Sequence, residues 1–389
     1  MLRWILEPRR PDPRTREPRA PGLAPAASPA LVLFLTLNLA ACGADSDAPP
    51  TDAPQGRLEL TATSVEVPTD ALLQAISPVS EEVVWISGHQ GTWLRTENGG
   101  ASWQTESAPA GDTLEFRDVA AFGPRTAYLM SAGLGARSRI YRTDDGGESW
   151  TRQYIATDPS EFLSCMAFWD EDTGVVYGDE FDGSLYLLRT SDGGANWDRI
   201  PPESLPASQE GEGGFAASGT CIIAGESGRG WIATGNAERP RVLMTEDRGL
   251  TWSAVDAPVV GGTMAGLFTV DVRGETGVAL GGAVGADTAR GRYVAISSDG
   301  GRSWEEGGAL AKTGAVYGAV LAPGLDAPVV VAVGPGGIDW STDGGRTWES
   351  ADDRTHWAVA FSAPGVGWAT GPEGRVTRIT IQRVADGEG

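Results

Sequence analysis

Six copies of a short polar turn that ends in tryptophan constrain the fold of this chain more than any other feature. The turns follow the consensus Ser/Thr-x-Asp-x-Gly-x-Ser/Thr-Trp, with Asn98 at the Asp position of the first copy and Asn196 at the second Ser/Thr position of the third. They span residues 96–103, 143–150, 190–197, 245–252, 297–304 and 341–348. Their tryptophans lie 47, 47, 55, 52 and 44 residues apart. A regular period of this length is typical of a repeat protein, and it matches one four-stranded propeller blade per repeat.

The residue types within each turn suit a structural role. The carboxylate of the Asp, which is Asn98 in the first copy, can accept N–H bonds inside the turn. Glycine provides the positive φ angles, and the tryptophan opens the next strand with a large apolar surface. We therefore expect the following turn residues to be scaffold: Asn98, Trp103, Asp145, Trp150, Asp192, Trp197, Asp247, Trp252, Asp299, Trp304, Asp343 and Trp348.

The segments between the turns predict an all-β, seven-bladed β-propeller. An inner strand, such as 72–78 or 162–168, is followed by an apolar second strand and by a third strand that leads into the turn. The second-strand motif occurs seven times, at 83–88, 126–131, 174–179, 230–235, 277–282, 329–334 and 366–371. The last copy is followed by only one more strand, at 375–380, so residues 56–65 are expected to complete the seventh blade and protect its edge. The predicted propeller covers residues 57–383, and 384–389 form a tail.

The turn consensus resembles the Asp-box, or BNR, repeat of sialidases, sortilin-type receptors and photosystem II stability/assembly factor propellers. The broader pattern, for example EVVWISGHQGTWLRTENGGASW at 82–103, is similar to the last of these families over about residues 70–380. This resemblance implies a propeller that binds or assembles a protein without catalysis. Sialidases also carry an Arg-Ile-Pro motif ahead of the first turn. Here Arg199-Ile200-Pro201 follows the third turn instead, so sialidase activity is not expected.

The N-terminal segment predicts export and lipid anchoring. Six arginines precede the apolar run 31–39, which is too short to span a bilayer, and the tetrapeptide 39–42 (LAAC) looks like a bacterial lipobox. Residues 1–41 are therefore interpreted as a lipoprotein signal peptide, Cys42 as the acylated first residue, and 42–56 as a disordered tether. Gly43 and Ala44 follow Cys42 without an Asp, which favours the outer membrane in enterobacterial-type sorting. An ordinary secretory signal is the alternative.

The acidic composition limits which kinds of partner the protein is expected to bind. The formal net charge of −22 disfavours nucleic acid and anionic lipid as partners. Basic proteins and cations are better candidates for partners, although an acidic surface can also serve solubility alone.

Cys165 and Cys221 lie in apolar runs assigned to inner strands of neighbouring blades. Buried free thiols are expected, and a disulfide is the alternative. The sequence has no Cys/His or EF-hand ligand spacing, so no metal or cofactor is expected, and calcium bound at 179–182 is a minor alternative.

The candidate binding face is the one opposite the polar turns, where loops joining second to third strands and consecutive blades meet. Acidic residues there can form an acid pair or cation site, and arginines, Arg137 and Arg292 included, can form an anion clamp. Two histidines from the first and seventh blades make an incomplete metal set. Solvated loops and structural hydrogen bonds explain these residues equally well. The candidates are His89, Arg139, Asp179, Glu180, Asp182, Glu212, Arg290, Arg354 and His356.

The function expected from these observations is non-catalytic binding or assembly of a protein client at the cell envelope. The alternative is an Asp-box glycoside hydrolase that acts on polysaccharide. Carbohydrate clefts place exposed aromatic rings beside paired carboxylates, so this alternative requires exposed rings at the channel mouth. The candidate rings are Trp93, Tyr177, Phe181 and Tyr317.

Overall fold

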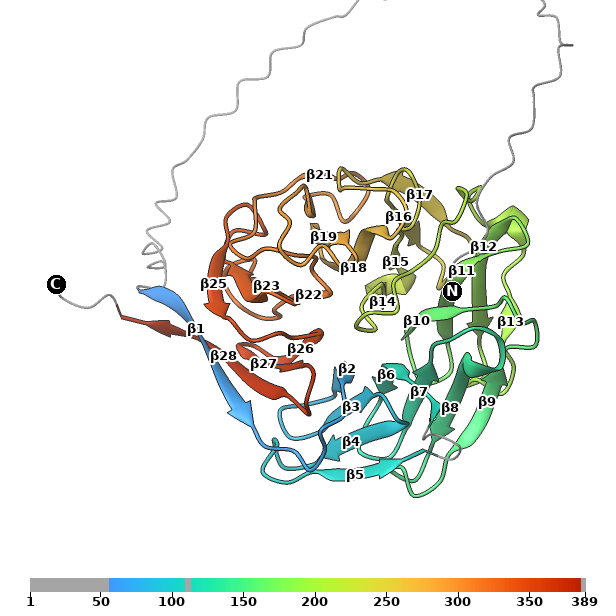
Figure 1. Cartoon of the computed structure of the whole chain (residues 1–389), viewed down its shortest axis with the longest axis horizontal. Helices are drawn as coiled ribbons and strands as arrows, with labels where there is room; N and C mark the ends of the chain where they lie inside the picture. Colours follow the sequence, from blue (N-terminus) through green and yellow to red (C-terminus); the bar gives the residue numbers. More distant parts are fainter. Residues whose placement is uncertain (1–55, 109–112, 386–389) are drawn as a thin grey trace, which may run out of the picture. The chain divides into compact units, whose positions relative to one another are not determined.

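A computed structural model describes residues 56–108 and 113–385. They form seven four-stranded antiparallel sheets arranged as blades around a central channel (Figure 1). The seven-bladed β-propeller predicted from the sequence is therefore confirmed. The predicted signal peptide, Cys42, all of the tether except Gly56, and the last four residues of the tail lie outside the described residues. Among the residues described, no helix is long and apolar enough to cross a membrane.

Blades one to six run outward from the channel in chain order. Their innermost strands are β2 (Leu73–Pro78), β6 (Phe116–Ala121), β10 (Leu163–Phe168), β14 (Ile222–Ala224), β18 (Ala265–Arg273) and β22 (Gly318–Leu321). The second strands are β3 (Val84–Gly88), β7 (Ala127–Ser131), β11 (Gly174–Phe181), β15 (Gly230–Ala233), β19 (Thr276–Ala283) and β23 (Val330–Gly334). The third strands are β4 (Thr92–Thr96), β8 (Arg139–Thr143), β12 (Ser184–Thr190), β16 (Arg241–Thr245), β20 (Val294–Ser297) and β24 (Gly337–Ser341). The outer strands are β5 (Gln104–Ser107), β9 (Thr151–Ile155), β13 (Asp198–Arg199), β17 (Ser253–Asp256), β21 (Glu305–Glu306) and β25 (Glu349–Asp352).

The seventh blade is closed by both ends of the domain, as the sequence predicted. Its strands are β26 (Ala358–Ala363), β27 (Val366–Thr370), β28 (Val376–Val384) and, outermost, β1 (Arg57–Val65). β1 pairs with β28 along its whole length, from Arg57 opposite Val384 to Val65 opposite Val376. Pairing of the first strand with the last closes the ring, because the chain cannot open there without breaking this ladder. In the described residues, short 3₁₀ segments lie in the loops at Gly135–Arg137, Pro202–Ser204 and Glu226–Gly228.

Two faces follow from this strand order. The polar turns join third to outer strands and lie on the same face as the turns between first and second strands; we call this the turn face. A repeated backbone bond links the two sets of turns, as in Gly146 N to Arg125 O at 2.9 Å and Gly300 N to Glu275 O at 2.9 Å. The remaining connections lie on the opposite face, which we call the loop face.

The polar turns have the internal geometry expected from their residue types. In all six, the first hydroxyl donates to the Asp or Asn Oδ1 over 2.7 to 2.9 Å. In the fifth turn, Asp299 also accepts Ser303 N at 2.9 Å and Ser303 Oγ at 2.6 Å. Of the closing tryptophans, Trp252, 7% exposed, is buried, and the other five are half-buried. Each outer strand begins one residue after its tryptophan, so the tryptophan ends the turn rather than opening the strand.

Acid is expected to weaken the fold through these turn carboxylates. Hydrogen bonds from the Ser303 side chain and backbone and from Ser297 lower the pKa of Asp299 from 3.8 to about 2. Because the folded pKa is depressed, the stabilisation is complete above about pH 4 and disappears as the pH falls through about 2. We expect Asp299→Asn to keep the neutral-pH melting temperature, since Asn98 makes the equivalent bonds in the first turn, and to show a smaller fall in melting temperature from pH 4 to pH 2. An equal fall in wild type and variant would contradict the assignment.

Each polar turn also packs against the preceding blade through the glycine at its fifth position. The glycines of the first, second and fifth turns face the rings of Trp368, Trp93 and Trp231. The clusters of buried side chains accordingly span neighbouring blades: one combines Trp85 and Trp93 of blade one with Phe116 and Leu129 of blade two. The turns therefore join blades to one another as well as strands within a blade.

Gly147→Ala should destabilise the protein by about 3 kcal/mol, the sum of an unfavourable backbone conformation and overpacking. Gly147 has φ +94°, and an added Cβ would lie 2.3 Å from the ring of Trp93, which is fully buried. Gly183→Ala is the matched control, because Gly183 has φ +73° and nothing within 4 Å of an added Cβ. Its cost should be limited to about 1 kcal/mol of backbone strain. Equal losses in chemical denaturation would show that the contact with Trp93 is unimportant.

Candidate functional site

Residues 214–220, which we call the plug, span the central channel. The plug accepts hydrogen bonds at Ala217 O from Gln74 Nε2 (3.2 Å) and at Ala216 O from Arg117 Nη1 (3.3 Å). Its Ser218 Oγ donates to Tyr317 O at 2.6 Å, and its Thr220 O accepts Val270 N at 3.1 Å. These partners belong to four different blades or their connections, on opposite sides of the channel. The plug therefore separates the loop-face mouth from the turn-face mouth.

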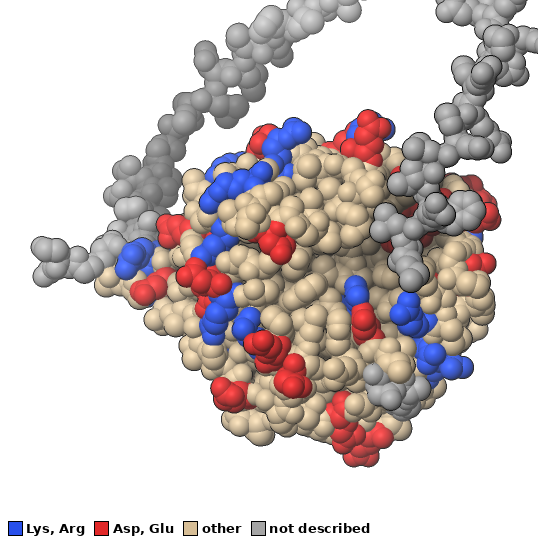
Figure 2. All heavy atoms as spheres, viewed as in Figure 1, with Lys and Arg blue, Asp and Glu red and all other residues tan. Residues whose placement is uncertain are grey.

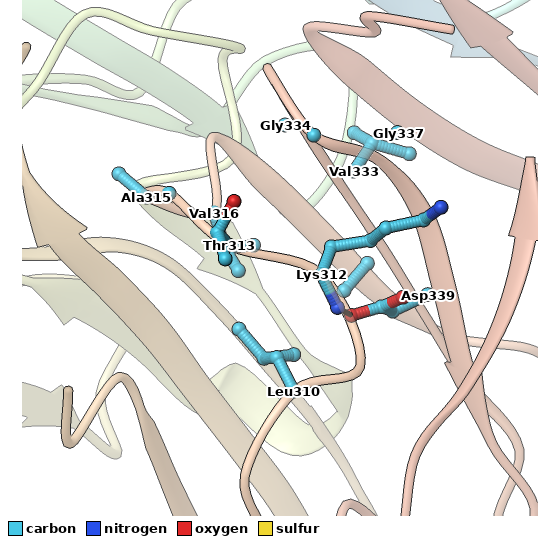
Figure 3. A pocket seen from close by; sticks show the side chains of 12 residues that line it. Leu310, Lys312, Thr313, Ala315, Val316, Val333, Gly334, Gly337 and Asp339 are labelled. Carbon is cyan, nitrogen blue, oxygen red and sulfur yellow. Dashed lines mark hydrogen bonds between the residues drawn. The ribbon is translucent and has the colours of Figure 1, made fainter. Parts of the chain in front are cut away.

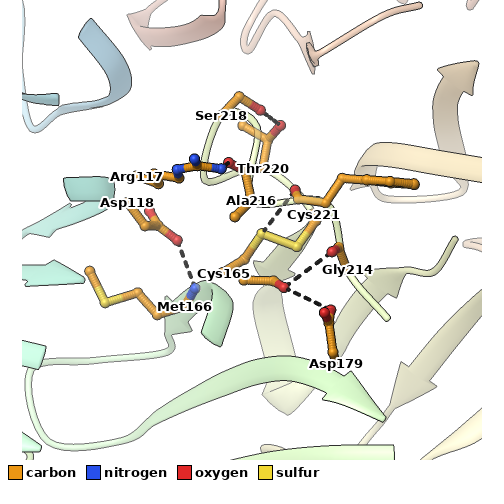
Figure 4. Close-up of a disulfide and its surroundings, with 12 residues drawn as sticks. Arg117, Asp118, Cys165, Met166, Asp179, Gly214, Ala216, Ser218, Thr220 and Cys221 are labelled. Carbon is orange, nitrogen blue, oxygen red and sulfur yellow. Dashed lines mark hydrogen bonds between the residues drawn. A yellow bond between two sulfur atoms is a disulfide. The ribbon is translucent and has the colours of Figure 1, made fainter. Parts of the chain in front are cut away.

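A disulfide fixes the end of the plug. Cys221 follows the plug directly, and its sulfur is bonded to Cys165 of β10, with a Cα–Cα distance of 6.0 Å (Figure 4). Both cysteines are fully buried. The prediction of free thiols was wrong, whereas their placement at inner strands of neighbouring blades was right. Adjacent inner strands run parallel around the channel, so two residues at the same height in neighbouring blades come within disulfide distance.

A buried carboxyl group lies against the plug. Asp118 of β6 accepts Met166 N at 2.7 Å and Val119 N at 2.8 Å, and thereby links the inner strands of blades two and three. A Cβ added to Gly219 of the plug would lie 2.4 Å from Asp118 Oδ1, so only glycine fits there. Burial raises the pKa of Asp118 to about 8 despite these hydrogen bonds. Because both of its hydrogen bonds go to backbone N–H groups of inner strands, we assign Asp118 a structural role.

Polar side chains of the first two blades form one side of the loop-face mouth. His89 Nε2 lies 2.5 Å from Gln74 Oε1 and 3.8 Å from Glu115 Oε2, and Arg117 Nε donates to Glu115 Oε2 at 3.0 Å. Burial lowers the pKa of His89, against the opposing effect of Glu115. Burial alone would raise the pKa of Glu115, but hydrogen bonds and charge from Arg117 lower it overall. His89 is thus neutral near pH 7, beside an ionised and partly exposed acid–base pair.

An aromatic row forms the other side of this mouth: Phe215, Phe268, Tyr317 and Trp357. The rings of Phe215 and Phe268 are stacked with centroids 4.0 Å apart, and those of Tyr317 and Trp357 with centroids 4.6 Å apart. The row packs on Ala217 of the plug, and three of its rings are partly buried, whereas Phe268 is buried. The sequence indicated only Tyr317. The sequence does hold a signal that could have identified Trp357 as well, because Tyr317 and Trp357 each directly precede an inner strand.

The four predicted acidic residues do not form an acid pair or cation site. Glu212 is fully buried and ion-paired with Arg241, whose Nε donates to Glu212 Oε1 at 2.9 Å. Asp179 accepts Ser164 Oγ at 3.5 Å and a bond from Gly214 N, and burial raises its pKa to about 6. Glu180 accepts Gly183 N at 2.9 Å, which stabilises the turn that also holds exposed Asp182. Within the described ranges, no group of three His, Cys, Asp or Glu residues is placed to hold a metal ion.

The predicted basic residues are also engaged within the chain. Arg139 Nε donates to Ala136 O at 2.6 Å, and Arg290 donates to Leu310 O at 2.9 Å and Ala311 O at 3.0 Å. Arg354 forms a bidentate pair with Asp352, with distances from 2.6 to 3.0 Å. His356 is fully buried between Arg354 O and Thr377 Oγ1, and burial lowers its pKa to about 4. Figure 2 shows one face, on which acidic and basic side chains are interspersed rather than gathered in a patch of one sign.

The rings needed for a carbohydrate cleft are largely inaccessible. Trp93 and Tyr177 are fully buried in the blades, and Phe181 packs against Tyr186 with ring centroids 5.3 Å apart. Of the four candidate rings, only Tyr317 lies in the aromatic row. Stacked sugar recognition at the loop-face mouth would therefore depend on residues other than those proposed from the sequence.

A second hollow, which we call the turn-face cavity, lies at the other end of the channel. Its volume is about 650 Å³, and it is bounded by the plug residue Thr220, by inner strands of blades four to seven, and by Trp169 and Trp231. Arg229, Arg273 and Asp271 are among its lining residues. Its volume lies within the usual range for small-molecule sites.

A much smaller cavity, about 20 Å³, lies between residues 310–316 and the strands β23 and β24 (Figure 3). Asp339 beside it is 3% exposed and accepts Lys312 N at 2.8 Å, while its Oδ1 has no hydrogen-bond partner among the described residues. Burial raises the pKa of Asp339, although Lys312 opposes this effect. The volume is that of about one water molecule, too small for a substrate.

The fold and the two mouths define the class: this is a single seven-bladed β-propeller with a plugged channel. No protein-family model and no curated protein matches the sequence. Among solved structures, it is similar to YCF48 bound to a D1 peptide, with a TM-score of 0.56 and 17% identity over 88% of this chain and 100% of the other. It is also similar to YCF48 from Cyanidioschyzon merolae, with a TM-score of 0.58 and 14% identity over 82% of this chain and 99% of the other. For the Neurospora crassa Pan2 WD40 domain, the TM-score is 0.56 and the identity 11%, over 80% of this chain and 89% of the other.

Proposed function

We propose that this protein is an exported, lipid-anchored propeller of the cell envelope that binds a protein client at its loop-face mouth without catalysis. The observation that carries the proposal is the aromatic row, three rings of which stay partly exposed across the mouth from the Glu115–Arg117 pair. We also propose that the six turns are Asp-box repeats and that Cys42 carries the lipid. The similarity to YCF48, solved with a D1 peptide bound, supports a peptide segment of a protein as the client.

The chemistry of the mouth suits a protein surface. Tyrosine and tryptophan supply large contact areas at small entropic cost, and such residues dominate the energetics of protein interfaces. The polar side adds a half-exposed carboxylate and guanidinium, with 40% and 30% of their side chains accessible, that can form directional hydrogen bonds. The predicted acids of this face that would serve hydrolysis are instead occupied by protein groups or, in the case of Asp182, exposed in a turn.

The test is a crosslinked pull-down from the native envelope, read by mass spectrometry. The variant Tyr317→Ala/Trp357→Ala should lose a client that wild type captures. Leu134→Ala is the control, because Leu134 is 56% exposed in the β7–β8 loop of the same face, outside the aromatic row. Equal capture by the double variant and wild type would refute this surface. Absence of any client, together with release of soluble sugar from polysaccharide by wild type, would instead support the hydrolase alternative.

Cys42→Ser should shift the protein from the membrane fraction to the soluble exported fraction. The reason is that stable anchoring requires the acyl chains that only the cysteine sulfur and its amine can carry. Fractionation followed by immunoblotting measures the shift, and labelling with a fatty-acid analogue checks the modification directly. A variant that stays fully membrane-associated would show that another feature holds the protein there.

A further inference from the structure

We propose that the turn-face cavity binds a small organic carboxylate, with its apolar body in the channel and its carboxylate at Arg229 and Arg273. This site lies on the opposite side of the plug from the proposed client surface and does not depend on it. The plug closes the inner end of the cavity at Thr220, so a ligand enters only from the turn face.

The walls of the cavity suit an apolar body. Val270, Val272, Ala319 and Val320 come from neighbouring inner strands, and Trp169 and Trp231 add aromatic surface. A concave, mostly apolar site with few polar groups is the usual form of a small-molecule site. The indole Nε1 of Trp169 donates to Arg229 O at 2.7 Å, which fixes the wall next to the arginine.

Two arginines, Arg229 and Arg273, lie at this wall. Arg229 stacks over the ring of Trp231, 5.4 Å from its centroid, and in the described part of the chain no acceptor or carboxylate pairs with its guanidinium. Stacking leaves the N–H edge of an arginine free for a carboxylate. Arg273 is 47% exposed at its side chain, and its ion-pair contact is a long one, 3.6 Å from Nε to Asp271 Oδ2. Blades four and five, which supply these arginines, are neighbours around the channel (Figure 1).

The carboxyl group of Asp271 is held mainly by backbone hydrogen bonds. It accepts Leu321 N at 2.8 Å and a bond from Val272 N, and so links the inner strands of blades five and six in the way Asp118 links blades two and three. Burial raises the pKa of Asp271, and the charge and side-chain hydrogen bond of Arg273 oppose this effect. Glu226, also at the cavity, is exposed to solvent. The lining of the cavity thus holds two arginines and two carboxyl groups, and in the described residues it is the guanidinium of Arg229 that no carboxylate pairs with.

The experiment uses the full-length protein and a panel of benzoate, phenylbutyrate and decanoate, each compared with its neutral primary amide. Ligand-observed NMR and titration calorimetry should show binding of a carboxylate in preference to its amide. Arg229→Gln and Arg273→Gln should each weaken that binding about tenfold, the effect of losing a charge-assisted hydrogen bond. Arg248→Gln is the control, because Arg248 lies on the same face, is 51% exposed and pairs with Asp170 outside the cavity.

The binding results distinguish a carboxylate site from its absence. A carboxylate preference that is lost in both cavity variants and kept in the control supports the site. Failure of every carboxylate to bind in preference to its amide overturns the proposal, as does equal binding by the cavity variants and wild type. The melting temperature of Arg229→Gln should stay near that of wild type, because its guanidinium makes no hydrogen bond within the described structure, whereas Arg273→Gln also removes the long ion pair with Asp271.

Discussion

Replacing Cys165 and Cys221 with alanine should lower the free energy of unfolding by about 4 kcal/mol, the loop-closure value for a crosslink of this span. The two cysteines are 56 residues apart in sequence, so the bond removes considerable freedom from the unfolded chain. In the folded state the bond holds the end of the plug against β10. We therefore expect the variant to lose plug order before the blades unfold, because each blade keeps its own strand ladder.

Chemical denaturation of oxidised wild type, reduced wild type and the double variant measures this effect. Reduced wild type should match the variant, which separates loss of the bond from loss of the sulfur atoms. Hydrogen exchange should show faster opening at residues 216–220 in the variant than at β6 or β18. A loss of stability below about 1 kcal/mol would mean that the plug is held by its hydrogen bonds alone.

Arg241→Met should lower the free energy of unfolding by about 4 kcal/mol, because it leaves the carboxylate of Glu212 buried without its partner. Glu212 is fully buried, and Arg241 is 9% exposed and also donates to Ala207 O at 3.0 Å. Glu212 further accepts Gln209 N at 2.9 Å. The pair thereby fixes the long connection from blade three to blade four, from which the plug continues.

Two further variants serve as controls for Arg241→Met. Glu212→Leu/Arg241→Met should recover most of the lost stability, since replacement of a whole buried ion pair by apolar groups is often neutral. Arg239→Met removes the exposed pair with Asp256, whose side chains are 66% and 56% accessible, and should change stability by less than about 1 kcal/mol. If Arg241→Met and Arg239→Met had the same small effect, Glu212 would have to be neutral or solvated in the folded protein.

The positions of the strands and the closure of the ring were predictable because they depend on local patterns. Each second strand was predicted within three residues of its observed bounds, because alternation and turn residues repeat along the chain. The pairing of β1 with β28 followed from a simple count: the seventh repeat lacked one strand, and one unassigned strand remained. The bonding inside the polar turns was also predictable, since donor and acceptor lie within a few residues of each other.

The candidate site could be predicted only in its location on the propeller. The loop-face mouth does gather residues from several loops, and His89 and Tyr317 lie there. However, Glu212 was expected to be a free acid and is the buried partner of Arg241, and Cys221 was expected to be a free thiol and is bonded to Cys165. Both partners are set by the path of the irregular connection 201–221, and no repeat pattern encodes that path.

The sequence by itself thus determined the blade number, the order of strands and the face on which the turns lie, because these follow from short-range periodicity. Tertiary structure alone decided that residues 214–220 fill the channel, that the aromatic row borders one mouth, and that a cavity of about 650 Å³ remains at the other. These features depend on which side chains from different blades meet across the channel. Such contacts join residues about 50 to 140 positions apart, as from Ser164 to Gly214 and from Gln74 to Ala217, and they form only once the ring has closed.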